Sequence, residues 1–471
     1  MIQRYGVLSS GFLLLALAVF VGLISGSAFA DDREQWTLGA ALGLPEEISL
    51  TGEHWTRYET LNSQFRANST GSDQILSLRT LVRAQWRLSP QFRIQAELQD
   101  ARAELADEGS RMNTSIVNAA ELLEANFTWT LKDIFAAGDR LEWTGGRLTM
   151  DIGKRRIVAR YRFRNTIQAY TGLDGQWTGS EGDHLRIFWT LPVHPRPEDQ
   201  PSLLANDVQM DQETLDRMFW GVFYAPGRLF WGNQGEVYVF GLHERDGEDF
   251  PTRNRQIYTP GFRFYHPARP GAFDFELESM FQFGTSRATS APGDARDLDH
   301  QAHFHHFEVG YTHAAPWSPR FYLEYDYASG DDDPNDGTND RFDLLFGPNV
   351  PEFGPTSINS AFVRGNLSSP GARLQVRPHP TLFAYLSYRA FWLASGSDGW
   401  AGASELRDIT GRSGKFLGHL LFLRAKWKAH PNLRLESGLA YRIDGNFQKT
   451  VPNSPREGNT LYTYIQTTLE F

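Results

Sequence analysis

Residues 75–88 read ILSLRTLVRAQWRL, and their side chains alternate between an apolar and a polar face. The polar face carries Ser77, Arg79, Arg83, Gln85 and Arg87, while leucines, Val82, Ala84 and Trp86 form the other face. A period of two residues predicts a β-strand. Three arginines on one face do not fit the core of a soluble sheet, but a water-filled lumen accepts them while lipid covers the apolar face. The stretch therefore predicts a strand of a transmembrane β-barrel.

The same alternation recurs along the chain, in residues 92–99, 272–283, 372–377 and 433–444. One such strand would also fit a half-exposed β-sandwich. The repetition, with long charged side chains on the polar face each time, favours the barrel.

Short proline turns alternate with long polar connections. The turns are Ser89-Pro90, Ser318-Pro319, His379-Pro380 and His430-Pro431, and proline sets the φ angle that a tight turn needs. The long polar stretches are 101–120, 192–217, 285–302, 328–355, 395–414 and 448–459. This alternation is typical of outer-membrane barrels, which have short periplasmic turns and long external loops.

We expect an all-β fold, an antiparallel transmembrane barrel of about eighteen strands, since an even number returns both ends to the periplasm. The expected strand cores are 52–64, 75–88, 92–100, 122–131, 140–150, 169–177, 183–191, 218–226, 235–243, 256–265, 272–284, 303–313, 319–328, 371–378, 381–394, 415–429, 433–445 and 460–471, with 358–369 treated as loop.

The first thirty residues resemble an export signal. Arg4 precedes an apolar run over 11–24, and Ala28-Phe29-Ala30 forms a small-residue cleavage pattern. A membrane anchor is the alternative, but the run is shorter than the about 20 residues that a spanning helix needs. We expect residues 1–30 to be a signal peptide, 31–51 an N-terminal periplasmic segment and 52–471 the barrel.

The composition of the chain excludes several classes of function. The chain has no cysteine, which excludes disulfides, thiol catalysis and zinc–thiolate sites. Its net charge of −10 does not favour nucleic-acid binding. A mean hydropathy of −0.43 with 13% aromatic residues suits a barrel whose strands alternate in polarity and whose rims carry aromatic girdles.

Arginine is concentrated on the expected inward faces, at Arg79, Arg83, Arg87, Arg373, Arg377, Arg389, Arg424 and Arg442. Residues 153–165 add six further cations and no acidic residue. Rings of arginine and lysine make anion-selective pores. Alternatively, these arginines pair with Glu97, Glu276, Glu278 and Glu436 across the lumen and only fill it.

Two clusters could suggest a metal. His303, His305 and His313 share one face of an expected strand, but we interpret them as interface histidines and predict no metal site. The acidic residues from Asp331 to Asp336 depart from the EF-hand spacing, so a solvated external loop is expected, with weak calcium binding in 331–340 as the alternative. No hydrolase or metalloprotease motif occurs, and we expect no catalytic residues and no enzyme.

The chain resembles the alginate-export porin family over about 52–471. The resemblance rests on Gly153-Lys154-Arg155, Arg164-Asn165, Tyr325-Asp326-Tyr327-Ala328-Ser329-Gly330-Asp331 and His430-Pro431-Asn432-Leu433, among others. Lys154-Arg155 and Tyr170-Thr171 depart from the Arg-Gln and Phe-Asp of the family. The resemblance implies an eighteen-stranded outer-membrane barrel in which Arg155, Arg156, Arg164 and Asn165 belong to an electropositive constriction.

Three hypotheses follow. The first is export of alginate or a related acidic exopolysaccharide through an anion-selective lumen. The second is a general or solute-specific diffusion porin, which the acidic Asp274, Glu276 and Glu278 motivate. An outer-membrane hydrolase is the third. Expected partners are membrane lipid and lipopolysaccharide, an anionic polysaccharide, the barrel-insertion machinery (signalled by the terminal Phe471) and a periplasmic export scaffold, but no nucleic acid.

Overall fold

The fold was analysed in a computed structural model that describes residues 35–471, apart from 108, 247–250, 292, 351 and 403–405. The expected signal peptide, residues 1–30, lies outside the described residues.

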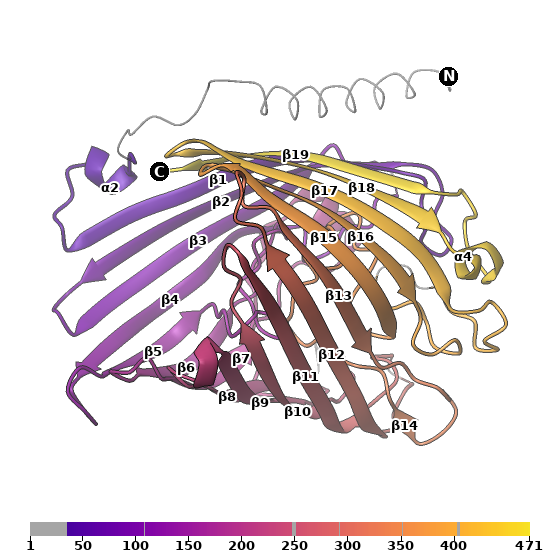
Figure 1. Ribbon diagram of the computed structural model, residues 1–471, viewed down its shortest axis with the longest axis horizontal. Coiled ribbons are helices and arrows are strands. Elements are labelled where there is room, and N and C mark those ends of the chain that lie inside the picture. Colours follow the sequence, from indigo (N-terminus) through magenta and orange to yellow (C-terminus); the bar gives the residue numbers. More distant parts are fainter. Residues whose placement is uncertain (1–34, 108, 247–250, 292, 351, 403–405) are drawn as a thin grey trace.

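In the described part of the chain, nineteen strands form one sheet, and eighteen of them close into a barrel of antiparallel neighbours (Figure 1). The wall strands are β1 (Ile48–Asn62), β2 (Asp73–Arg87), β3 (Phe92–Glu104), β4 (Asn118–Lys132), β5 (Arg140–Leu148), β6 (Tyr170–Thr178), β7 (His184–Pro192), β8 (Arg217–Ala225), β9 (Gln234–Glu244), β10 (Gln256–His266), β11 (Ala272–Ser286), β12 (Leu298–Thr312), β13 (Arg320–Ala328), β15 (Leu367–His379), β16 (Leu382–Trp392), β17 (Phe416–His430), β18 (Leu433–Asp444) and β19 (Thr460–Glu470).

The expected barrel of eighteen strands is confirmed. The first strand begins at Ile48, four residues before the expected start of the barrel at residue 52. The remaining strand, β14 (Thr338–Asn339), pairs in parallel with β12 and is a short addition to its end. Helical segments are brief: α2 (Leu38–Ala41), α3 (Gln200–Ala205), η1 (Phe230–Gly232) and α4 (Asn446–Thr450). Within residues 35–471 as described, no helix combines the length and apolarity that crossing a bilayer requires.

Closure depends on the pairing of the first and last strands. β1 runs antiparallel to β19 from Glu53 opposite Glu470 to Asn62 opposite Leu461. Gly52 and Phe471 extend the ladder: the Gly52 amide donates to the Phe471 carbonyl at 2.5 Å, and the Phe471 amide donates to the Gly52 carbonyl at 2.9 Å. The barrel is therefore closed by its last residue.

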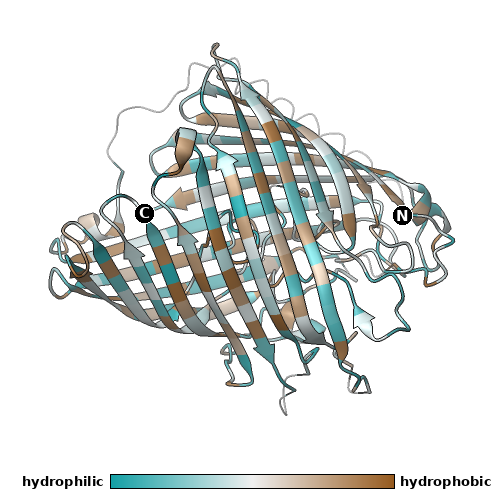
Figure 2. Cartoon of the chain, turned by 60° about the horizontal axis from the view of Figure 1, so that its bottom comes forward, coloured by the Kyte–Doolittle hydropathy of each residue, from teal (hydrophilic) through white to brown (hydrophobic). Residues whose placement is uncertain are grey.

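The period of two places apolar side chains outside and charges inside, and bands of alternating hydropathy follow the strands in Figure 2. On β11, Phe273 and Phe281 are exposed, whereas Asp274, Glu276 and Glu278 of the same strand are buried in the interior. The polar side of the sheet thus faces the lumen, as expected.

The connections are short at one end of the barrel and long at the other. The turns at 88–91, 313–319, 380–381 and 431–432 stand where proline predicted them. At the opposite end, long loops cover 193–216, 329–366 and 393–415. Because Glu53 pairs with Glu470, the start of β1 and the end of β19 both lie at the short-turn end.

Gly52 offers a test of closure. A Cβ atom at this residue would lie 2.3 Å from Cε2 of Phe471 and 2.8 Å from the carbonyl oxygen of Leu81. We predict that Gly52→Val destabilises the folded barrel by about 1–3 kcal/mol, the usual cost of overpacking. Urea titration and the mobility of unheated protein in gel electrophoresis measure this. The control is Gly293→Val, since a Cβ atom there meets nothing within 4 Å; equal stability of the two variants would contradict the prediction.

Candidate functional site

Two connections turn into the barrel instead of covering its mouth. We call residues 149–169 the inner loop and residues 329–366 the long loop. They meet at a parallel bridge between Val158 and Phe346, where the Phe346 amide donates to the Ile157 carbonyl at 3.1 Å. The Tyr161 hydroxyl donates to the Phe346 carbonyl at 2.9 Å. The two loops are therefore joined along their backbones.

An apolar wall supports this joined unit on one side of the lumen. Phe188, Phe219 and Phe240 point inward from β7, β8 and β9 and belong to one buried cluster with Val158 and Phe346. The rings of Phe219 and Phe346 lie 4.9 Å apart. Aromatic packing of this kind fixes the position of the loops and fills this side of the interior.

Buried ion pairs attach the inner loop to the wall. Arg156 is 3% exposed and donates to Glu276 at 2.6 Å, with further pairs to Glu278 and to Glu352 of the long loop. On the other side, Arg160 pairs with Glu97 of β3 at 2.8 Å. The inner loop is thus held to β3 and to β11 by ion pairs.

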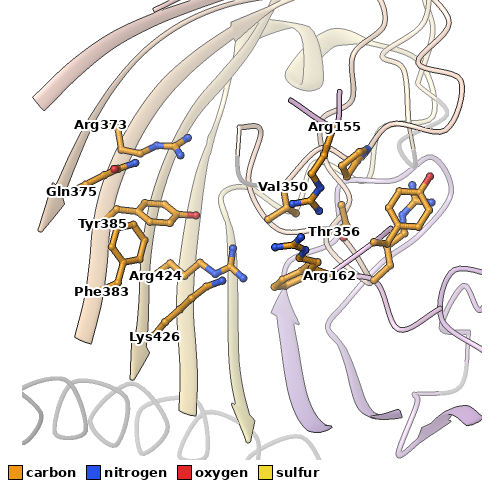
Figure 3. A pocket seen from close by; sticks show the side chains of 14 residues that line it. Arg155, Arg162, Val350, Thr356, Arg373, Gln375, Phe383, Tyr385, Arg424 and Lys426 are labelled. Carbon is orange, nitrogen blue, oxygen red and sulfur yellow. The ribbon is translucent and has the colours of Figure 1, made fainter. Parts of the chain in front are cut away.

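A cavity of about 220 Å³ remains between the two loops and strands β15, β16 and β17, and we call it the cationic chamber (Figure 3). Its lining contains six cationic side chains, four aromatic rings and no carboxylate. The cations are Arg155, Arg162, Arg164, Arg373, Arg424 and Lys426. The rings are Tyr161, Phe163, Phe383 and Tyr385. Figure 3 shows Arg155 and Arg162 on the loop side and Arg373, Arg424 and Lys426 on the strand side.

A second cavity, of about 740 Å³, continues from the chamber, and we call it the vestibule. The two share Tyr161, Arg162 and Lys426. Gln35 and Glu470 also line the vestibule, which places it at the end of the barrel that carries the short turns. Its lining is mixed in charge, with Glu53, Glu97, Glu436 and Glu470 among arginines.

The predicted pore residues separate into three groups. Arg155, Arg164, Arg373 and Arg424 line the chamber, and Arg79 and Arg83 line the vestibule. Arg87 and Arg377 are exposed near the short-turn end of their strands. The remaining four do not line either cavity but are buried in contacts: Arg156, Asn165, Arg389 and Arg442.

Those four residues hold the structure together. The Asn165 amide donates to the carbonyls of Leu78, Arg102 and Ile116. Arg389 pairs with Asp326 at 2.5 Å. Arg442 pairs with Asp444 at 2.7 Å. Because most of their donors are already engaged, the structure assigns these residues to packing inside the barrel.

The alternative that the arginines pair with carboxylates is also present, although Glu97 and Glu436 pair with arginines of the neighbouring strand and not across the lumen. Glu97, Glu276, Glu278 and Glu436 each accept an ion pair from arginine, as that alternative expected. Arg164 differs, because it forms no ion pair with any carboxylate in the described part of the chain. Charge is therefore compensated along most of the wall, and five of the six chamber cations pair with Asp151, Glu324 or Glu436 just outside the lining. Among the described chamber cations, the uncompensated charge is that of Arg164.

Sequence reasoning missed two chamber cations as site residues. Lys426 follows Arg424 by two residues on the same inward face of β17, and that spacing could have identified it. Arg162 belongs to the cation-rich stretch of 153–165, and its side chain is 72% exposed in the lumen. The distinction between Arg162 and the buried Arg156 depends on how the inner loop folds.

The inner loop turns sharply at its start. Gly153 and Arg155 adopt positive φ angles of 54° and 69°, and such a conformation is uncommon for a residue with a side chain. The Arg155 guanidinium donates to Asp151 at 2.9 Å. This turn places Arg155 at the chamber.

The histidines are split between the two faces of β12. His303 and His305 lie on the outer face and contact each other at 3.0 Å, whereas His306 is buried inside against Asp326 at 2.8 Å. In the described ranges, no three potential ligands among histidine and acidic residues lie together as a metal site. Weak calcium binding in 331–340 stays a prediction of the sequence.

An acidic contact fixes the external loop 193–216 to the wall. Asp211 accepts from the Asn118 amide at 2.8 Å and from the Arg196 backbone at 2.9 Å, while its own amide donates to Glu121 at 2.9 Å. Burial, reinforced by the charge of Glu121, raises the pKa of Asp211 from 3.8 to about 7. The carboxyl group thus holds its proton in the folded protein at mildly acidic pH.

Comparison with known proteins gives a family and a fold. The family model described as alginate export matches residues 46–459. No curated protein sequence matches the chain. Among solved structures, Pseudomonas aeruginosa OccK9 (OpdG) is similar with a TM-score of 0.58 at 12% identity, covering 90% of this chain and 98% of that one.

Two further structures from Pseudomonas aeruginosa share the fold. OpdK with vanillate has a TM-score of 0.54 at 11% identity, covering 90% of this chain and 98% of its own. The outer membrane protein OprD has a TM-score of 0.52 at 13% identity, covering 95% of this chain and 97% of its own.

The buried ion pairs of the inner loop predict a large loss of stability when Arg156 is replaced. Arg156→Ala should lower the free energy of unfolding by about 3–5 kcal/mol, because Glu276 and Glu278 lose a buried partner. Chemical denaturation with intrinsic fluorescence measures this. Arg162→Ala is the control: its exposed pair with Asp151 should contribute no more than about 1 kcal/mol. Similar losses in both variants would contradict a special role of Arg156 in fastening the loop.

The contact of Asp211 with the wall predicts that the stability of the loop 193–216 depends on pH. Its folded-state pKa lies above the ordinary value, so the stabilisation is complete below pH 3.8 and is lost as the pH rises to about 7. Hydrogen-exchange protection factors in 193–216, which correct for the rise of intrinsic exchange with pH, should fall over that interval. Asp211→Asn should remove the dependence, whereas Asp207→Asn, at an exposed residue of the same loop, should retain it. Protection factors that stay constant with pH in the unsubstituted protein would refute this assignment.

Proposed function

Because the chain belongs to the alginate-export family, we propose that this outer-membrane pore exports alginate or a related acidic exopolysaccharide through an arginine-lined lumen. The observation that carries the proposal is the cationic chamber, where six cations and no carboxylate line the cavity. We propose direct contact between these cations and the carboxylates of the polymer.

Location and class are established at a coarser level. The protein is a β-barrel of the bacterial outer membrane and therefore contacts membrane lipid. The matched family is an export family and not a family of enzymes. The short turns of the barrel, together with the start of β1 and the end of β19, accordingly face the periplasm. The vestibule opens on that side, and the chamber lies further inside.

Electrostatics support passage of an anion. A fixed cation in a narrow lumen lowers the free energy of an entering anion and raises that of a cation. Guanidinium groups also match carboxylates geometrically, since two N–H groups can reach both oxygens. A uronate polymer presents one carboxylate per sugar, so successive units could exchange between the cations of the vestibule and those of the chamber.

The second candidate is a diffusion porin for small anionic solutes. Two observations favour it: the chamber is only about 220 Å³, and the inner loop is attached by buried ion pairs. OpdK, which shares the fold, was solved with vanillate, a small carboxylate. On this proposal the chamber would select single anions by charge and size.

Two partners are proposed from the ends of the barrel. Phe471, which continues the alternation of β19, suits recognition by the barrel-insertion machinery. The periplasmic rim around the vestibule would be the contact for an export scaffold, where Trp36 and Asn432 join the N-terminal segment to the turn between β17 and β18 through hydrogen bonds of 2.9 and 2.6 Å.

Ion selectivity in planar bilayers tests the proposal. Under a potassium chloride gradient, the reversal potential should show anion preference, and uronate oligomers should block the current. Lys426→Ala should lower the anion-to-cation permeability ratio up to about five-fold, equivalent to about 1 kcal/mol for charges about 4 Å apart in water. Lys132→Ala, at an exposed lysine outside both cavities, should leave the ratio unchanged.

Cation preference, or no block by uronate oligomers, would rule out export of an acidic polymer. Liposome swelling then separates the two candidates. Rapid uptake of single small solutes, anionic or neutral, would favour the diffusion porin, whereas their exclusion together with block by uronate oligomers would favour polymer export.

A further inference from the structure

Arginines inside this barrel are held in two different ways. Most donate to carboxylates, which fixes the guanidinium and also neutralises its charge. Arg164 and Arg377 are held by aromatic rings instead. The guanidinium carbon of Arg164 lies 4.3 Å from the ring centre of Tyr161, and that of Arg377 lies 5.0 Å from the ring centre of Phe383. Neither arginine forms an ion pair with a carboxylate of the described chain.

The supporting rings belong to the cationic chamber. Both Tyr161 and Phe383 line it, and Tyr161 also borders the vestibule. Tyr161 is 6% exposed, and its hydroxyl donates to the Phe346 carbonyl, so the ring is fixed where the two loops join. Phe383 lies on β16, part of the barrel wall. Each ring therefore offers a rigid support.

A ring and a carboxylate have opposite consequences for an anion in the lumen. Stacking on an aromatic face restrains the guanidinium while leaving its formal charge, and its N–H groups at the edge stay free for a ligand. A carboxylate restrains the same group but cancels its charge and uses its donors. Arginines supported by rings are thus both positioned and uncompensated.

We infer that Tyr161 and Phe383 are positioning residues for anion selectivity: uncharged themselves, they hold Arg164 so that its charge faces the chamber and Arg377 so that its charge stays uncompensated at the short-turn end of the barrel. This inference rests on the proposed anion-conducting function. It adds that selectivity depends on two neutral residues, and that Arg164 and Arg377 contribute more per charge than the arginines paired with carboxylates.

Arg263 provides the internal comparison. Its guanidinium carbon lies 3.6 Å from the ring centre of Tyr265, closer than either stack in the inference. However, Arg263 also pairs with Glu236 at 2.8 Å and with Glu276 at 2.7 Å. Its charge is compensated and its position is fixed without the ring, so the loss of Tyr265 should not change selectivity.

The test is reversal-potential measurement on the full-length protein in planar bilayers. Tyr161→Leu and Phe383→Leu should each lower the anion-to-cation permeability ratio by about two- to five-fold, which corresponds to a stacking free energy of about 0.5–1 kcal/mol. Tyr161→Phe and Phe383→Tyr keep the ring and should keep the ratio. Tyr265→Leu is the matched control and should also keep it.

A double-substitution cycle separates positioning from a general structural effect. Once Arg164→Ala has removed the cation, Tyr161→Leu should cause no further loss of selectivity, because the ring acts only through that arginine. Independent, additive losses would overturn the inference. The Phe383 and Arg377 pair repeats the cycle at the strand side, so the test stands even where Tyr161→Leu impairs folding.

The outcomes distinguish failure of this inference from failure of the proposed anion-conducting function on which it rests. An unchanged ratio in both leucine variants, together with a lower ratio in Arg164→Ala, would overturn the positioning role and leave the anion-conducting function intact. A wild-type protein without anion preference would overturn both.

Discussion

The structure depends on the satisfaction of every backbone hydrogen bond within a single closed ladder. Lipid offers no partner for an unpaired amide or carbonyl group, so a sheet in a membrane must have no free edge. Here the pairing of β1 with β19 removes the edge, and Gly52 makes room for the ring of the last residue. The alternation of side chains, the separation of lipid from water and the existence of a lumen all follow from that closure.

Closure leaves an interior that must be filled or kept open, and this protein does both. Aromatic side chains of β7, β8 and β9 and the two inward loops pack one side of the lumen as a core. Buried ion pairs such as that between Arg156 and Glu276 then fix the loops to the wall. The open space that remains is a small chamber and its vestibule, so the loops determine the bore as much as the strands do.

The presence or absence of a carboxylate partner for each arginine divides the interior into regions with different roles. Where arginine meets glutamate, as at Arg263 with Glu236 and Glu276, the charges cancel and the pairs stabilise the fold. Where arginine meets an aromatic ring without an acid, as at Arg164 and Tyr161, the charge remains effective toward a solute. An acidic chain of net charge −10 can thereby hold a locally cationic chamber.

The sequence by itself determined the barrel, because side chains that alternate between lipid and water leave a period of two that needs no tertiary information. Each of the eighteen strands, the proline turns and the inward face of Arg373 and Arg424 could be read in this way. Only the tertiary structure decided which arginines are buried in contacts away from both cavities and which line the chamber. Arg156 and Arg162 belong to the same run of cations, yet one lies among three carboxylates and the other faces open space. The folding of the inner and long loops brings residues distant in sequence together, and no local periodicity encodes those contacts.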